Sequence, residues 1–231
     1  MTKIIKVIIP AYNEEESIGK VIAEIPEIVS EIIVVDNNST DSTSEVAKKT
    51  GATVLFQHNT GYGNACLKGM EYIFEEKTKP DIVVFLDGDY SDYPSELTKI
   101  VAPILEDDID FVVGARVKKL REVGSMTFPQ RFGNQLATKL MTLFFSSKFT
   151  DLGPFRAIKY EKLLALNMED KTYGWTVEMQ LKVLKKKFIY VEVPVNYKNR
   201  IGVSKVSGTL KGAIFAGIKI LSWIFKYSFK K

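Results

Sequence analysis

Cysteine and histidine are nearly absent from this 231-residue chain, which carries one of each, Cys66 and His58. A single cysteine excludes an intramolecular disulfide framework and is compatible with a reducing compartment. His58 lies at the end of a predicted strand, and we interpret it as a surface residue rather than a catalytic base. Internal repeats and low-complexity linkers are also absent. We therefore expect one domain with a C-terminal appendage.

The sequence also lacks a hydrophobic run that fits a signal peptide or a membrane-spanning helix. The apolar run in MTKIIKVIIPAYNEE is too short for a signal peptide and leads directly into a polar turn. The segment 210–229 is about long enough to cross a bilayer, but its internal lysines argue against spanning. We interpret 207–229 as an interfacial amphipathic helix with snorkelling lysines. The alternative is a helix that packs on the protein's own core or on a dimer partner.

Acidic residues are missing from the C-terminal end of the chain, although the overall net charge is only +4. No acid follows Glu192, whereas the same stretch carries Lys198, Arg200, Lys205, Lys211, Lys219, Lys226, Lys230 and Lys231. Such a tail suggests an anionic partner, either a membrane surface, phosphates or nucleic acid, or else a solvated basic face. Nucleic acid is disfavoured because these cations alternate with large aliphatic side chains.

What is present is an alternation of short β-branched runs with helical patterns. This alternation predicts βαβ units and a mostly parallel sheet, and the nearly continuous apolar strands predict a sheet buried on both faces. The predicted strands are 3–10, 31–36, 52–57, 81–87 and 110–116, and the predicted helices are 15–29, 41–50, 63–77, 94–106, 131–147 and 175–186.

Each of the five predicted strands ends in polar residues. In open α/β sheets, ligands bind outside the carboxyl ends of the strands. Five polar strand ends on one rim therefore predict a ligand-binding crevice. The polar ends are PAYNE, DNNSTD, HNTGYGNA, DGDYSD and GAR.

The acids of the fourth strand end are the strongest candidates for a metal site. Asp87 and Asp89, one residue apart, can hold a divalent cation and leave positions for diphosphate oxygens and water. Gly88 between them permits an unusual backbone angle or the close approach of a ligand. Without a cation the two carboxylates would raise one another's pKa. The alternative is a solvated acidic turn that caps the helix near Pro94.

Two further strand ends fit a nucleotide. Asp36 could accept hydrogen bonds from a ribose or a base, while Asp41 or Ser39 would cap the following helix. The segment TGYGNACLKG offers glycines ahead of a helix, where a nucleotide phosphate or base could approach the backbone. A G-x-G alone is a weak signal.

These motifs together carry a family resemblance. The sequence resembles inverting family-two glycosyltransferases with the GT-A (Rossmann-like) fold, most of all dolichyl- or polyprenyl-phosphate mannose and glucose synthases. The resemblance covers about residues 4–208, with a GT-A catalytic domain at 1–206 and a basic amphipathic C-terminal helix at 207–231. The matching segments, in order, are VIIPAYNEEESIGKVI, EIIVVDNNSTDST, NTGYGNACLKGM, FLDGDYSDYP, GAR, DLGPFRAI, WTVEMQLK and RIGVSKVSG.

The resemblance implies a role for each matching residue. Asp87 and Asp89 would bind the donor diphosphate through Mg²⁺ or Mn²⁺. The catalytic set would be Asp89, Asp151, Glu178 and Arg131, with Asp151 and Glu178 near the sugar. The nucleotide-sugar site would comprise Pro10, Tyr12, Glu14, Asp36, Asn38, Gly63, Asn64, Asp87, Gly88, Asp89 and Arg116. The phosphate and acceptor ligands would be Arg131, Arg156, Arg200 and Lys205.

Two positions depart from the family pattern. Ser91 stands where relatives often carry a metal-coordinating glutamine, and Asn37 stands where many carry a second acid. The sequence leaves open whether Ser91 or Asp92 completes the metal site.

The implied activity is the metal-dependent, inverting transfer of a hexose from a UDP- or GDP-sugar to a polyprenyl (dolichyl-type) phosphate. A lipid phosphate is already anionic and needs no strong general base, whereas a hydroxyl acceptor would need Asp151 or Glu178 as base. The alternatives are a soluble glycosyltransferase with a hydroxyl acceptor, in a polysaccharide or glycolipid, and a non-catalytic nucleotide-sugar-binding module. The expected location is cytoplasmic, peripheral at the inner face of the cell membrane, with the C-terminal helix contacting membrane or a second copy.

Overall fold

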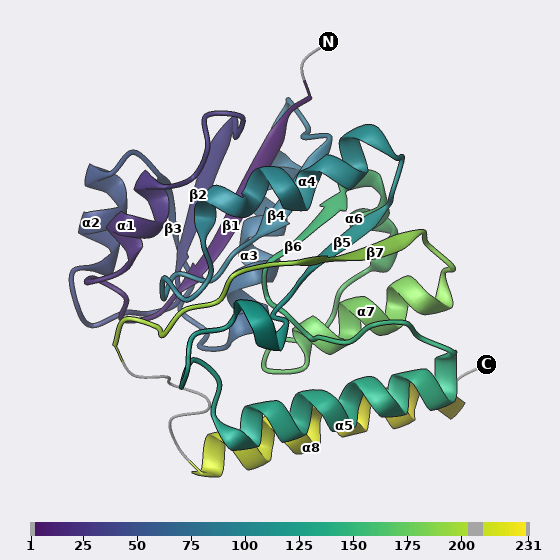
Figure 1. Ribbon diagram of the computed structural model, residues 1–231. Helices are drawn as coiled ribbons and strands as arrows, with labels where there is room; N and C mark the ends of the chain where they lie inside the picture. The colour runs from purple at the N-terminus through teal and green to yellow at the C-terminus, as the bar shows by residue number, and fades with distance from the viewer. Residues whose placement is uncertain (1–2, 203–209, 230–231) are drawn as a thin grey trace.

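A seven-stranded sheet forms the centre of the computed structural model, which describes residues 3–202 and 210–229 (Figure 1). The strand order is β3-β2-β1-β4-β6-β5-β7, and every pairing is parallel except those of β6 with β4 and β5. The predicted mostly parallel α/β fold is therefore confirmed. The strands are β1 (Ile5–Ala11), β2 (Glu31–Asp36), β3 (Thr53–Phe56), β4 (Ile82–Phe85), β5 (Phe111–Ala115), β6 (Arg156–Lys159) and β7 (Tyr190–Pro194).

The sequence predicts five of these strands and misses β6 and β7. Both are short, with four and five residues, and Arg156 and Glu192 interrupt their apolar patterns. The sequence likewise gives no signal for α6 (Tyr160–Leu166), which follows β6 directly.

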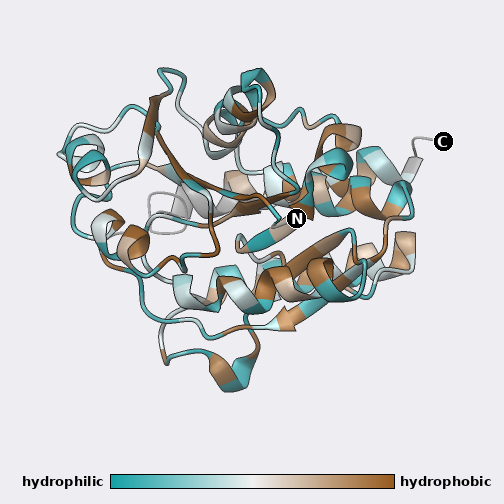
Figure 2. Ribbon diagram, turned by 90° about the horizontal axis from the view of Figure 1, so that it is seen from above, coloured by the Kyte–Doolittle hydropathy of each residue, from teal (hydrophilic) through white to brown (hydrophobic). Residues whose placement is uncertain are grey.

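Helices cover both faces of the sheet, so that two hydrophobic cores form. Alternate residues of β1 divide between them: Ile8 belongs to the core that contains residues of α3, α5 and α7, whereas Val7 and Ile9 belong to the core that contains residues of α1 and α4. Figure 2 shows hydrophobic residues along the central strands and mixed colouring on the surrounding helices. The helices are α1 (Ile18–Ala23), α2 (Thr43–Lys49), α3 (Tyr62–Glu75), α4 (Leu97–Glu106), α5 (Phe128–Phe145), α7 (Trp175–Lys185) and α8 (Leu210–Phe229), with short 3₁₀ turns η1 (Pro94–Glu96) and η2 (Lys118–Leu120).

β1 lies between β2 and β4, so the order of the parallel strands reverses at β1. The crossovers from β1 and from β4 therefore run in opposite directions, and a crevice opens at the carboxyl ends of these two strands. This is the topological switch point where open α/β sheets bind ligands.

The C-terminal helix α8 runs beside α5 and packs on the body of the protein (Figure 1). Trp223, Ile224 and Tyr227 are buried against the core that contains α7. The Trp223 indole donates to Asp170 Oδ2 at 2.5 Å, and Lys219 forms an ion pair with the same oxygen at 3.0 Å. One face of α8 therefore packs on the protein's own core, which is one of the two alternatives to an interfacial helix that the sequence leaves open.

The opposite face of α8 is apolar and exposed at Phe215, Ile218 and Phe225. These positions share one stripe because they follow helical spacing. Among the residues that the structure describes, none of the helices combines the length and apolarity needed to cross a membrane. The predicted boundary between residues 206 and 207 lies outside the described residues.

Candidate active site

A cavity of about 420 Å³ opens at the switch point, as the polar strand ends predict. We call it the crevice pocket. The carboxyl ends of β1, β2 and β4 supply most of its walls, and the start of α3, the loop before α7 and Arg200 supply the rest. Its lining is Pro10, Ala11, Tyr12, Glu14, Asn37, Thr60, Gly61, Tyr62, Asp87, Gly88, Asp89, Thr172, Tyr173 and Arg200.

The Asp-x-Asp pair lies in the wall of the crevice pocket, directly after β4. The Tyr62 hydroxyl donates to Asp87 Oδ1 at 3.0 Å. Burial, together with the charge of Asp89, raises the pKa of Asp87 to about 7. Such a carboxylate loses its proton readily when a cation arrives, since an opposite charge favours the ionised form.

Asp89 offers its two oxygens to different partners. Oδ1 accepts from the Ser91 backbone N–H at 2.9 Å and from the Ser91 hydroxyl at 2.6 Å. Oδ2 forms an ion pair with Arg200 at 3.1 Å. The same guanidinium donates to Glu14 Oε1 at 2.8 Å, so Arg200 bridges Asp89 and Glu14 across the pocket.

The residues of the crevice pocket fit a hard divalent cation. Mg²⁺ is commonly held by one or two carboxylates, with substrate phosphates and water completing an octahedron. Asp87 and Asp89 supply two such carboxylates. Within residues 3–202 and 210–229, no cluster of three or more His, Cys, Asp and Glu is arranged to hold a metal. The remaining ligands would therefore come from the diphosphate and from water.

Neither Ser91 nor Asp92 belongs to the lining of the crevice pocket. Ser91 orients Asp89 instead. The Asp92 carboxylate is buried, and its oxygens find no hydrogen-bond partner among the described residues. Burial and the nearby charge of Asp87 raise the pKa of Asp92 well above its ordinary value.

The second strand end contributes Asn37 rather than Asp36. Asp36 is buried and accepts from the Ser39 backbone N–H at 2.8 Å and from the Ser44 hydroxyl, which shapes its own loop. Asn37 Oδ1 accepts from the Gly61 backbone N–H at 2.7 Å at the pocket wall. Asn38, with a φ of 68°, lies outside the lining.

Asp41 has the predicted capping role in the same loop. Its carboxylate accepts from the backbone N–H of Thr43, the first residue of α2, at 3.0 Å.

The glycine-rich segment contributes Thr60, Gly61 and Tyr62 to the crevice pocket, whereas Gly63 and Asn64 lie outside its lining. At Gly63 a Cβ would collide with the backbone of 170–171, so the glycine allows this chain's own loop, not a nucleotide, to approach. The Gly63 N–H donates to Thr172 O at 3.2 Å, and the Asn64 N–H donates to Lys171 O at 3.0 Å. We therefore correct both residues from ligand contacts to supports of the loop that carries Thr172 and Tyr173.

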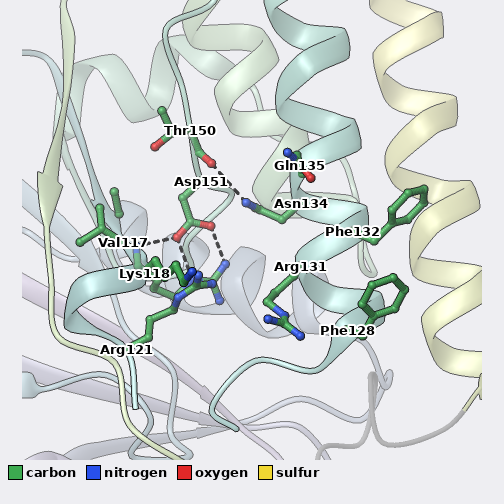
Figure 3. Close-up of a pocket in the computed structure, with 12 residues that line it drawn as sticks. Val117, Lys118, Arg121, Phe128, Arg131, Phe132, Asn134, Gln135, Thr150 and Asp151 are labelled. Atoms are coloured by element: carbon green, nitrogen blue, oxygen red, sulfur yellow. Dashed lines mark hydrogen bonds and ion pairs between the residues drawn. The ribbon is translucent and has the colours of Figure 1, made fainter. Parts of the chain in front are cut away.

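A second cavity, of about 590 Å³, lies between the end of β5, η2 and the first half of α5 (Figure 3). We call it the basic pocket because four cations line it. Their charges suit an anion such as a phosphate. The lining is Ala115, Arg116, Val117, Lys118, Arg121, Phe128, Arg131, Phe132, Asn134, Gln135, Thr150 and Asp151.

Asp151 is bound to Arg116 inside the basic pocket. Arg116 Nε and a terminal nitrogen donate to its two oxygens at 2.8 and 2.7 Å, and the Arg116 backbone N–H donates at 2.7 Å (Figure 3). Burial opposes ionisation, but the Arg116 charge and these bonds hold the pKa of Asp151 below its ordinary value. Asp151 is thus a weak base that orients Arg116.

Glu178 and Arg156 lie in neither pocket, which corrects their predicted roles. Glu178 is fully buried and accepts from the backbone N–H groups of Glu169 and Asp170 at 2.9 and 2.8 Å, beside an ion pair with Lys182 at 2.7 Å. Both oxygens of Glu178 are thus engaged by the loop after α6 and by Lys182.

Arg156 is likewise fully buried in β6. Its guanidinium donates to the carbonyl oxygens of Leu152, Gly153 and Thr176, and burial lowers its pKa to about 10. It holds the segment that carries Asp151, rather than a phosphate. Lys205, the remaining predicted phosphate ligand, lies outside the described residues.

The structure adds pocket residues that the sequence analysis misses. Lys118 and Arg121 line the basic pocket, and their only sequence signal is the basic run KKLR after the fifth strand. Tyr62, Thr172 and Tyr173 line the crevice pocket. Thr172 and Tyr173 come from a loop that reaches the site through tertiary packing, for which the sequence carries no signal.

An α/β sheet with an Asp-x-Asp crevice at its switch point and a cationic pocket beside it defines a GT-A glycosyltransferase. Residues 6–165 match glycosyl transferase family 2, and the chain belongs to this family. The predicted family and enzyme class are therefore confirmed.

Curated relatives cover nearly the whole chain. An uncharacterized glycosyltransferase of Mycobacterium bovis is 35% identical over 92% of this chain and 94% of its own length. A dolichyl-phosphate hexose transferase of Haloferax volcanii is 31% identical over 90% of this chain and 88% of its own length.

The fold also matches solved structures. The glucosyl-3-phosphoglycerate synthase of Mycobacterium tuberculosis, in complex with Mn²⁺, uridine diphosphate and glucosyl-3-phosphoglycerate, has a TM-score of 0.77. The match covers 97% of this chain and 80% of that one, at 23% identity. At this identity the likeness establishes the fold alone.

Proposed function

We propose that this glycosyltransferase transfers a hexose, with inversion, from a nucleotide-diphospho-sugar to a polyprenyl (dolichyl-type) phosphate. The basic pocket carries this proposal, because it combines four cations with the two aromatic side chains of Phe128 and Phe132. That combination is complementary to an anion with an apolar tail. The dolichyl-phosphate hexose transferase among the relatives supports the same acceptor class.

The crevice pocket would bind the donor. Pro10 and Tyr12 line the side where the nucleoside would lie, and Asp87 and Asp89 would hold the diphosphate through Mg²⁺ or Mn²⁺. When bound, the cation would stabilise the negative charge that develops on the leaving diphosphate. Arg200, which pairs with Glu14 and Asp89, would add a second positive charge next to the diphosphate.

The acceptor phosphate would bind to Arg116, Arg121 and Arg131 in the basic pocket. Its oxygen is already anionic, so attack on the anomeric carbon needs positioning rather than a strong base. A hydroxyl acceptor would need a base, and Asp151 is already tied to Arg116 by two short bonds. The geometry therefore favours a phosphate acceptor over a hydroxyl acceptor.

A membrane-facing surface would give the enzyme access to such an acceptor. Leu143 and Phe144 on α5 and Phe215, Ile218 and Phe225 on α8 are exposed, and the rings of Phe144 and Phe225 lie 5.9 Å apart. We propose that this surface binds the cytoplasmic leaflet of the cell membrane peripherally. A homo-oligomer formed through the same surface is the alternative, which sedimentation with and without vesicles distinguishes.

Incubation of the purified protein with radiolabelled UDP- and GDP-sugars, with and without polyprenyl phosphate and Mn²⁺, tests the proposed function. Label should enter lipid only when polyprenyl phosphate is present. Asp89→Asn should abolish transfer, while Lys99→Ala, which removes an exposed cation on α4, should not change it. Transfer of label to a hydroxyl acceptor without polyprenyl phosphate would reject the proposal, and donor binding without any transfer would indicate a non-catalytic module.

A further inference from the structure

Two phenylalanines at the start of α5 are exposed although the helix has a buried face available. Phe128 is 71% exposed and Phe132 is 58% exposed, and their rings stack with centroids 6.4 Å apart and an interplanar angle of 19°. The buried face of α5 begins further along, at Ala137 and Met141. The pair is therefore not part of the core.

The start of α5 is fixed in place by local contacts. Thr127 caps the helix: its hydroxyl accepts from the Gln130 N–H, and the Gln130 side chain accepts from the Thr127 N–H at 2.7 Å. This capping box, with Pro129 in the first turn, sets the direction of the first residues. The aromatic pair is thus presented on a formed helix end rather than on a loose loop.

The two aromatic rings and the cations occupy different sides of the same cavity. In Figure 3, Arg131 and Asn134 lie on the side of α5 that faces Asp151, whereas Phe128 and Phe132 lie on the side toward α8. A phosphate held by the cations would leave any attached chain to run out past the aromatic pair. The site is polar where an anion would bind and apolar where a hydrocarbon tail would leave.

We propose that Phe128 and Phe132 bind the first isoprene units of the acceptor and thereby select a lipid phosphate over a water-soluble phosphate. This inference rests on the proposed function. It assigns a role in acceptor specificity to two side chains that are not among the four cations of the basic pocket. Stacked, preformed rings bury apolar surface of a ligand with little loss of their own conformational freedom. Apolar contact of this kind should raise affinity for the tail without changing affinity for the phosphate.

Equilibrium binding tests the inference without requiring turnover. Farnesyl phosphate and inorganic phosphate are titrated separately into the wild-type chain and into Phe128→Ala/Phe132→Ala. The double variant should bind farnesyl phosphate about 10- to 100-fold more weakly, since two aromatic contacts are lost. Its affinity for inorganic phosphate should not change. Because both side chains are exposed, the variant should keep its thermal unfolding midpoint.

Two control variants identify the source of the effect. Phe74→Ala removes a comparably exposed aromatic side chain, 60% exposed, from α3, where it lines neither pocket, and should leave both affinities unchanged. Arg121→Ala should weaken both ligands.

Equal affinity of wild type and the double variant for farnesyl phosphate would overturn the inference. An equal loss in Phe74→Ala would also overturn it, because general adhesion of the lipid to exposed aromatic side chains would then explain the effect. If the wild type binds farnesyl phosphate through the pair but transfers no sugar to polyprenyl phosphate, the proposed function fails and the binding site stands. If the wild type transfers sugar to lipid and the double variant keeps its farnesyl phosphate affinity, the proposed function stands and the inference fails.

Discussion

Replacement of Arg200 by alanine should tighten the binding of Mn²⁺ to the donor-free protein. Asp89 Oδ1 is already engaged by Ser91, so Oδ2 is the oxygen that a cation would take. Arg200 forms its 3.1 Å ion pair with that same Oδ2 and holds Glu14 at 2.8 Å. A metal that binds Asp89 must therefore displace the guanidinium.

The size of the effect follows from the strength of that bridge. Two charge-assisted contacts of a partly exposed arginine stabilise the bridge by about 1–2 kcal/mol, allowing for solvent screening. Each 1.4 kcal/mol corresponds to a factor of about ten in affinity. The donor-free Arg200→Ala variant should therefore bind Mn²⁺ about 5- to 30-fold more tightly than the wild type. With the diphosphate present the sign should reverse, since Arg200 would then be available to the phosphate oxygens, and the variant should bind UDP more weakly.

Electron paramagnetic resonance of free Mn²⁺, with and without UDP, measures both effects. Lys198→Ala provides the matched control: it removes the same charge from the same segment, but Lys198 packs over the rings of Tyr90 and Tyr93. Arg200→Ala with unchanged or weaker donor-free Mn²⁺ affinity would refute the competition. Equal tightening in Lys198→Ala would refute it too, because the effect would then be one of net charge.

Four further substitutions test one residue of the crevice pocket, two residues that support the loop after α6, and one residue of α5. In metal-free buffer the pKa of Asp87 is about 7 in the folded protein and about 3.9 in the unfolded chain. The free energy of unfolding should therefore fall by a few kcal/mol as pH rises from 4 to 7, because the unfolded chain loses this proton first. Asp87→Asn should reduce this pH dependence, as measured by urea titrations at each pH. Glu178→Ala should cost about 3–5 kcal/mol because it removes the nearest ion-pair partner of buried Lys182 and the acceptor of the Glu169 and Asp170 N–H groups. Normal stability with lost kcat would instead support a catalytic role. Gly63→Ala should destabilise the fold by displacing the loop after α6, while Gly133→Ala, with open space around its Cβ, should stabilise α5 by about 0.5–1 kcal/mol, both measured by thermal unfolding.

The sequence predicts the fold well where local pattern and tertiary context agree. The five apolar strands and the helices between them follow from periodicity, because β1, β4 and β5 are buried along their whole length and each helix has one apolar stripe. Helix boundaries are less well predicted: α1 spans only Ile18–Ala23 of the predicted 15–29. β6 escapes prediction because its pairing depends on β4 and β5, more than 40 residues distant in the chain.

The candidate site is predictable where a strand end alone determines position. Asp87, Asp89 and Glu14 reach the crevice pocket because β4 and β1 end there. Glu178 and Arg156 each lie in a segment that resembles the family, but their side chains point into the interior. There Glu178 accepts hydrogen bonds from backbone N–H groups, and Arg156 donates to backbone carbonyl oxygens. Sequence cannot distinguish a charged residue that faces a ligand from one that satisfies buried backbone groups.

The separation of charge between the two pockets explains how one sheet edge could handle two phosphate-bearing substrates. The crevice pocket presents the carboxylates of Asp87 and Asp89, which repel a bare phosphate and accept one only through a cation. The basic pocket presents arginines, which bind a phosphate directly. The segment 197–201 connects them: the Tyr197 ring lies 5.1 Å from the Arg116 guanidinium, and Arg200 pairs with Asp89. Under the proposed function, a metal-bound diphosphate would bind at the Arg200 end of this segment and a metal-free monophosphate at the Tyr197 end.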